Sequence, residues 1–122
     1  MTRRLLATQC TGAAWAVDAD SVERIVRRSD WLEQPPLDVA SSLALAPLPD
    51  ALERVLVVQG ASGAKALLSR GMLALIEVSA SDVATVPSIV YGSSLGPVRS
   101  VVLEAMGFPV LIFDPDSLQA RG

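Results

Sequence analysis

Short apolar stretches separated by turn-forming residues run through most of this chain, and this pattern limits the possible folds more than any other feature. The stretches are rich in Val, Leu and Ile, and Gly, Pro, Ser or Thr interrupts them before a long helix could form. Such a pattern predicts a mostly β protein, built as one small β-barrel or as two linked ones, with only brief helices. The expected strands are residues 5–10, 13–17, 54–58, 65–68, 72–78, 98–104 and 109–113.

Brief helices are expected where a capping residue precedes apolar residues at helical spacing. Asp20 and Glu23 can form a capping box, and Val22, Ile25 and Val26 follow at that spacing, so a helix of about two turns is predicted to end near residue 28. Further helical turns are predicted at residues 40–45, at residues 81–83 and after residue 114.

Composition supports one folded domain over residues 1–122. Half of the chain is apolar, yet no apolar run reaches the ~18 residues that a membrane-spanning helix needs, so no membrane insertion is expected. Cys10 is the only cysteine, which rules out an intrachain disulfide, and the polar residues within the first 17 positions argue against a signal peptide. A cytoplasmic protein is therefore expected. A net charge of -3 with only five aromatic residues argues against a nucleic-acid partner.

The sequence contains one pattern typical of hydrolases. Gly92-Ser93-Ser94-Leu95-Gly96 matches G-x-S-x-G, in which the serine is a nucleophile and a histidine accepts its proton. The chain contains no histidine, so a small-residue loop is the favoured interpretation. A small serine hydrolase that uses Ser93 or Ser94 stays open as the alternative function.

Other candidate sites are better explained without chemistry. Lys65 follows Ser62 at S-x-x-K spacing, but both lie on a predicted hairpin turn where the lysine would stay protonated. The carboxylate pairs Asp18/Asp20 and Asp114/Asp116 lack a third ligand and fit helix starts. No catalytic residue, metal or cofactor is predicted. Of the tryptophans, Trp15 is expected in the core, whereas Trp31 fits a core or a partner contact equally well.

The order of the elements resembles the CheW-like domain, the coupling module of bacterial chemosensory systems. The opening AAWAVDADSVERIVR contains an approximation to "V-x-E-V-x-R" at residues 22–27, and Gly71, Met72 and Leu75 match a glycine before a "V-x-x-V" strand. Asp114 and Leu118 match a terminal "hydrophobic-Asp-x-x-x-Leu". These motifs are individually weak, and their shared order along most of the chain carries the resemblance.

The resemblance implies a non-enzymatic adaptor with two small linked, SH3-like β-barrel subdomains. In the family, one surface docks the regulatory domain of the CheA histidine kinase, and an apolar groove between the barrels holds the tip of a chemoreceptor coiled coil. A chemoreceptor cytoplasmic domain is therefore the implied partner, with a CheA-type kinase or a full-length CheW-like protein as others. For each apolar position among the implied contacts, a place in the core is an equal alternative. The implied receptor-binding positions are Val22, Arg24, Met72, Leu75 and Ser100.

The chain departs from the family at residues 30–42, DWLEQPPLDVASS. Family members carry a segment with a "G-x-x-N-L-R-G" motif here, so this stretch is interpreted as a deletion junction. One barrel is then expected to be incomplete, with kinase docking weakened or lost. In its shortened length the chain resembles the short coupling protein of the "frizzy" gliding-motility chemosensory system. An incomplete barrel also leaves strand edges, so self-association is a further prediction.

Overall fold

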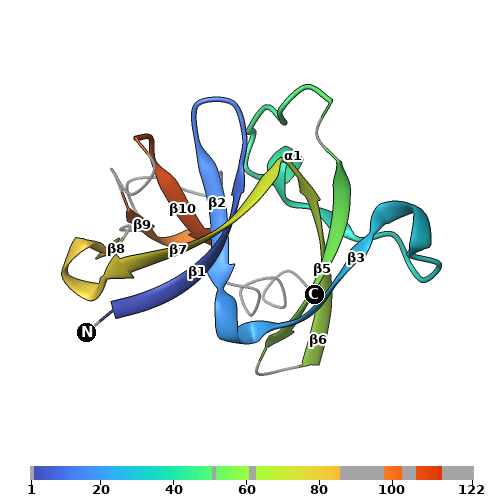
Figure 1. Ribbon diagram of the computed structural model, residues 1–122, viewed down its shortest axis with the longest axis horizontal. Coiled ribbons are helices and arrows are strands. Elements are labelled where there is room, and N and C mark those ends of the chain that lie inside the picture. Colours follow the sequence, from blue (N-terminus) through green and yellow to red (C-terminus); the bar gives the residue numbers. More distant parts are fainter. Residues whose placement is uncertain (1, 51, 61–62, 86–97, 103–106, 114–122) are drawn as a thin grey trace.

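The computed structural model describes residues 2–50, 52–60, 63–85, 98–102 and 107–113, and in this part of the chain two β-sheets lie side by side (Figure 1). The six-stranded sheet has the order β7-β1-β2-β10-β9-β8, and the four-stranded sheet has the order β3-β5-β6-β4. The expected mostly β fold is confirmed. The strands of the larger sheet are β1 (Thr2–Gln9), β2 (Ala14–Asp18), β7 (Met72–Ser79), β8 (Ala84–Thr85), β9 (Val98–Val102) and β10 (Val110–Phe113), and those of the smaller are β3 (Val22–Arg27), β4 (Leu37–Asp38), β5 (Glu53–Gly60) and β6 (Gly63–Arg70).

Six of the predicted strands pair as three antiparallel hairpins, β1–β2, β5–β6 and β9–β10. β1 and β2 pair antiparallel around a turn in which Gly12 has φ +77°, a left-handed conformation that glycine adopts without strain. The Cys10 N–H closes this turn by donating to the Ala13 carbonyl at 2.8 Å. β5 pairs with β6 along its full length, and β10 pairs with β9.

The predicted helix over residues 20–28 is wrong. Only one 3₁₀ turn, η1 (Ala19–Ser21), forms there, and the chain then enters β3, which pairs antiparallel with β5. A β-bulge between Val22 and Arg24 shifts the register, so Val22 and Ile25 come to lie opposite residues of the same sheet face although they are three positions apart. A bulged strand thereby reproduces an apolar spacing typical of a helix, and the β-branched Val and Ile favour the strand.

The other predicted turns have mixed outcomes. One short helix, α1 (Val39–Ser42), overlaps the start of the predicted range 40–45, and the Asp38 carboxylate caps it by accepting from the Ser41 N–H at 3.2 Å. The turn near residue 81 is the 3₁₀ turn η3 (Ala80–Asp82), with Ser79 as its cap. The helix expected after residue 114 lies outside the described residues.

The apolar side chains form two separate clusters. One, here the private core, is built only from the six-stranded sheet. The other, here the shared core, lies between the two sheets and α1, and Trp15 meets Phe113 there edge to face at 6.1 Å between ring centroids. The expected core position of Trp15 is confirmed, since it is fully buried. The private core is Leu5, Ala7, Ala14, Ala16, Val78, Val102, Val110 and Ile112, and the shared core is Cys10, Trp15, Val17, Val39, Ala40, Leu43, Leu56, Val58, Leu67 and Phe113.

A single residue joins the two sheets where β6 becomes β7. Gly71 is buried, and a Cβ at this position would overlap the backbone carbonyl oxygen of Gln9 on β1. Two residues earlier, the Ser69 hydroxyl shares a buried hydrogen bond of 2.9 Å with that of Thr8. The chain therefore crosses between the sheets at a closely packed point that only glycine fits.

Residues 28–36, here called the strap, form most of the connection in which the sequence suggested a deletion junction. The strap begins with the 3₁₀ turn η2 (Arg28–Asp30) and joins β3 to β4, which occupy opposite edges of the four-stranded sheet. Three strand spacings of about 4.8 Å separate these edges, a distance that nine residues span easily. The chain thus passes directly from one edge of the smaller sheet to the other, and the sheet stays open at β3 and β4 within the described residues.

Candidate functional site

Leu75 places a large apolar side chain on the surface where the two sheets meet. It lies on β7, an edge strand of the six-stranded sheet within the described residues, and 59% of its surface is exposed. Its partner across the ladder is Leu6, and both Leu6 and the neighbouring Leu73 pack against the shared core. Leu75 thereby extends the apolar surface of the shared core outward to solvent.

Met72 also lies on β7 and is 62% exposed, but it belongs to the opposite face of the strand because it is three residues from Leu75. Its partner across the ladder is Gln9. Neither Met72 nor Leu75 is a core residue, so the core alternative is excluded for these two positions. Both remain exposed along one sheet edge.

The remaining implied contact positions are not gathered beside them. Val22 is half-buried on β3 of the other sheet and packs against the shared core, so it has a structural role. Ser100 lies on β9, four positions from β7 in the strand order, opposite Thr85 and Ile112. The structure brings Met72 and Leu75 onto one edge and leaves Val22 and Ser100 elsewhere.

Arg24 has a role that the sequence did not indicate. Its guanidinium carbon lies 5.5 Å from the centre of the Trp31 ring, and Nη2 lies 3.6 Å from Oε2 of Glu33. The Trp31 indole N–H in turn donates to the Gln34 carbonyl at 2.8 Å. Arg24 therefore holds the strap against β3, and Trp31 is a strap residue rather than a member of either core.

The strap also borders a surface pocket over one face of the four-stranded sheet. Trp31, Gln34 and Pro35 of the strap line it together with Val57 of β5 and Ala66 of β6. Because these residues come from the strap on one side and from β5 and β6 on the other, the strap lies over this face of the sheet. Val57 on this face is 6% exposed.

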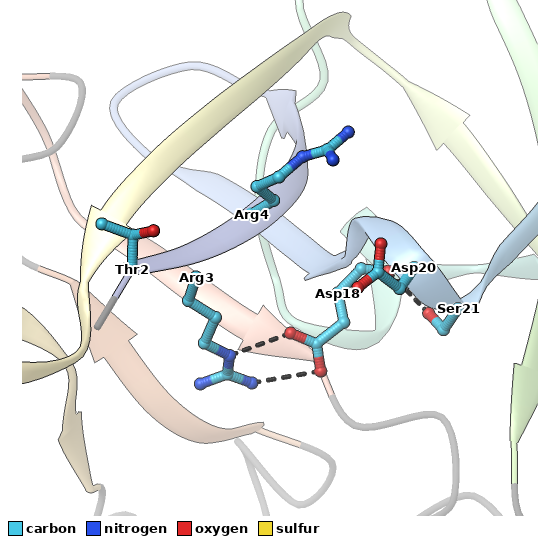
Figure 2. Close-up of a pocket in the computed structure, with 6 residues that line it drawn as sticks. All are labelled: Thr2, Arg3, Arg4, Asp18, Asp20 and Ser21. Atoms are coloured by element: carbon cyan, nitrogen blue, oxygen red, sulfur yellow. Dashed lines mark hydrogen bonds and ion pairs between the residues drawn. The ribbon is translucent and has the colours of Figure 1, made fainter.

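A second pocket at the start of β1 has mixed charge. Figure 2 shows the Arg3 and Asp18 side chains facing each other, while Arg4 points away from this pair. Arg3 donates to the two Asp18 oxygens at 2.9 and 3.2 Å, and the Ser21 hydroxyl donates to the Asp18 carbonyl at 2.7 Å. The charges of Arg3 and Asp18 therefore neutralise each other, and this pair is not a candidate for binding a ligand.

Two ionisable side chains near the shared core, Asp38 and Cys10, have shifted pKa values that structural contacts explain. Burial raises the pKa of Asp38, but the hydrogen bonds from Ser41 and Arg70 outweigh it and hold that pKa below its ordinary value. Burial and the Asp38 charge raise the pKa of the Cys10 thiol, and Arg70 only partly opposes them. Cys10 is thus a protonated, unreactive core residue at neutral pH.

No catalytic arrangement is apparent in the part of the chain that the structure describes. No group of three His, Cys, Asp or Glu side chains could hold a metal ion among these residues. The Gly92–Gly96 loop of the hydrolase alternative lies outside the described residues, and no observation here favours that alternative. No helix in the described ranges has the length and apolar character needed to cross a bilayer.

Comparison with known proteins identifies the fold. No protein-family model matches the sequence, and no curated protein matches it. Among solved structures, the chain is similar to the scaffolding protein TtCheW from Thermoanaerobacter tengcongensis, with a TM-score of 0.73 and 10% sequence identity over 94% of this chain and 86% of that one. The resemblance seen in the order of the sequence elements is therefore a resemblance of structure, and this chain has a CheW-like fold.

Proposed function

We propose that the protein is a non-enzymatic chemosensory adaptor that binds the cytoplasmic tip of a chemoreceptor and links it to signalling partners. The observation that carries this proposal is the exposed Leu75 at the surface junction of the two sheets, in a chain with the fold of a CheW scaffolding protein. A helical receptor tip presents apolar side chains along one face, which suits an exposed apolar strip on a rigid sheet edge. Met72, with its adaptable thioether, offers a second exposed apolar side chain on the opposite face of the same edge strand.

The other implied contacts enter the proposal with different roles. Arg24 acts through the strap that it holds, and Val22 supports the shared core from within. Ser100 on β9 would need the receptor to reach a second part of the larger sheet. Leu75 and Met72 are therefore the positions at which substitution is most informative.

Kinase docking is proposed to be weakened or lost, as expected for a shortened coupling protein of the FrzB type. The support is the strap, which connects β3 directly to β4 where family members carry a longer segment. The strand that follows the strap, β4, has only two residues. A full-length CheW-like protein or a CheA-type kinase would then meet an altered surface on this sheet.

Self-association through the β3 edge also stays a prediction. This edge carries a bulge and the exposed side chains of Arg24 and Arg27, features that disfavour strand pairing between copies. Sedimentation velocity at rising concentration tests it, and a single monomeric species throughout would contradict self-association.

Substitution of Leu75 by Asp tests the receptor-binding proposal. We expect the charged side chain to weaken binding to a purified chemoreceptor cytoplasmic fragment by about 2 kcal/mol or more in titration calorimetry, because it would be buried against an apolar helix. Stability should change little, since the side chain is 59% exposed.

Leu32→Asp is the matched control, because Leu32 is 91% exposed and lies on the strap, which joins two strands of the sheet that does not contain β7. Equal binding by wild type and the Leu75 variant would contradict the proposal. The same titration with the regulatory domain of a CheA-type kinase tests the second part, and tight binding there would show that the strap preserves the kinase surface.

A further inference from the structure

Three arginines gather at one end of the four-stranded sheet. Arg27 ends β3, Arg28 begins η2, and Arg54 lies on β5 directly opposite Arg27 in the antiparallel register. Together with Ser29, Leu52 and Glu53 they line an open pocket of about 570 Å³, here called the basic pocket. β-sheet pairing alone creates this cluster, because Arg54 is distant from the other two in sequence.

The cluster lacks a neutralising partner within the described residues. The ion pairs found there involve the other arginines Arg3, Arg24 and Arg70, and none involves Arg27, Arg28 or Arg54. Glu53 is the only acidic residue lining the basic pocket, and its Oε2 lies 3.3 Å from Nε of Arg70. The positive charge of the pocket is therefore not balanced from within.

The three neighbouring arginines are expected to lower the stability of the fold rather than raise it. Like charges directly across a strand pair destabilise the sheet, and Arg27 and Arg54 occupy such a pair. The chain has a net charge of -3, so an excess of basic residues does not explain three arginines at one place. Beside them, Leu52 leaves 69% of its surface exposed.

We propose that the basic pocket docks an acidic segment of a partner protein. The carboxylates of that segment would pair with the guanidinium groups of Arg27, Arg28 and Arg54, which accept carboxylates in a two-pronged geometry. An apolar side chain of the same segment would pack against Leu52. Charge and apolar surface at this pocket are complementary to a segment that combines Asp or Glu with Leu-like residues.

A protein fits the basic pocket better than other anionic partners do. Binding to an anionic membrane generally uses clusters of about four to eight basic residues, and this pocket has three with one acidic neighbour. A single-stranded nucleic acid would need aromatic side chains for stacking, and none lines the pocket. The pocket also belongs to the sheet that does not contain Leu75, so it is a second docking surface whose existence does not depend on receptor binding.

The test uses a fluorescein-labelled peptide that combines Glu and Leu residues, with a control peptide carrying Gln in place of Glu. We expect fluorescence anisotropy to show saturable binding of the Glu peptide, weakening as salt is raised, and no binding of the Gln peptide. Arg27→Glu should reduce the affinity at least about tenfold. Leu52→Ser should reduce it by a smaller factor.

Arg4→Glu is the matched control, because Arg4 is likewise exposed on a strand and lies on the other sheet. It should leave the affinity unchanged, and thermal unfolding should show no loss of stability for Arg27→Glu, which removes a like-charge pair. Equal weakening by both substitutions would overturn the proposal in favour of general charge attraction. Failure of the peptide to bind would also overturn it, and binding of phosphatidylserine vesicles instead would assign the pocket to a membrane surface.

Discussion

The two sheets of this protein differ in how they bury apolar surface. The six-stranded sheet curls around the private core, whose members all come from its own strands. Among the described residues the four-stranded sheet has no such cluster, and its Leu56, Val58 and Leu67 are buried in the shared core together with Trp15 and Phe113 of the larger sheet. The smaller sheet thus depends on the larger one for its core, whereas the larger sheet has a core of its own.

Substitution of Trp15 by Ala should break this dependence with the largest effect. Loss of a fully buried indole costs about 3–5 kcal/mol of unfolding free energy. Hydrogen exchange should show the greatest loss of protection for the backbone amides of β5 and β6. The amides of β1, a strand that contributes to the private core, should stay protected.

Ile112→Ala in the private core is the control for Trp15. It should cost about 2–5 kcal/mol and lower protection in both sheets, because the smaller sheet depends on the larger. The comparison fails if Trp15→Ala lowers protection uniformly or if Ile112→Ala leaves the four-stranded sheet protected.

Gly71→Ala addresses the point where one sheet passes into the other. A methyl group there would overlap the Gln9 carbonyl oxygen and press on the Thr8 side chain, so we expect a loss of about 1–3 kcal/mol in urea denaturation. Gly107→Ala is the control. A methyl group at this position would meet no neighbouring atom, and only the positive φ disfavours alanine, so the loss of unfolding free energy should be smaller. Similar losses for both would show that packing at the crossing is not tight.

Low pH should lower the stability of the smaller sheet by protonating Asp38, the last residue of β4 and the N-cap of α1. Its carboxylate accepts from the Ser41 hydroxyl and from Arg70, each at 2.9 Å, and its pKa in the folded state lies below the unfolded value of about 3.9. The ionised form therefore stabilises the fold above about pH 4, and this contribution is lost as the pH falls through the lower folded pKa.

Asp38→Asn should remove that part of the acid dependence and cost about 1 kcal/mol at pH 7, since two charge-assisted hydrogen bonds are lost at a partly exposed site. Urea denaturation at pH 7 and pH 3 checks this. If wild type and variant lost the same stability between the two pH values, Asp38 would not be the responsible group.

The smallest expected effect concerns the strap. Arg24→Ala removes the contact with Trp31 and the exposed ion pair with Glu33, which together contribute about 0.5–1 kcal/mol. Limited proteolysis should then cut within residues 28–36 faster than in wild type. Arg4→Ala, which removes an exposed arginine from the larger sheet, should leave the cleavage rate unchanged.

Much of the fold follows from local sequence. The hairpins at residues 5–17, 54–68 and 98–113 were predictable because turn residues separate apolar stretches of strand length. The helix predicted at residues 20–28 failed because the bulge in β3 imitates helical spacing, and pairing with β5 overrides the local capping signal.

The functional surfaces depend on tertiary arrangement and were harder to predict. Met72 and Leu75 look the same in sequence whether they fill a core or face a partner, and only the edge position of β7 exposes them. The basic pocket was hidden because Arg54 reaches Arg27 only through strand pairing. The adjacent pair Arg27-Arg28 was the single local signal of it.

The crossing at Gly71 also bears on how a bound partner would be felt elsewhere in the molecule. Strands β6 and β7 are one nearly continuous run of chain with a single residue between them, and the crossing is fastened to β1 by the Thr8–Ser69 hydrogen bond. The path along the chain from Leu75 into the smaller sheet therefore contains no loop, only strand backbone and the Gly71 crossing. Because the proposed receptor surface and the basic pocket lie on these two sheets, the short crossing would limit how far two partners bound at them could move relative to each other.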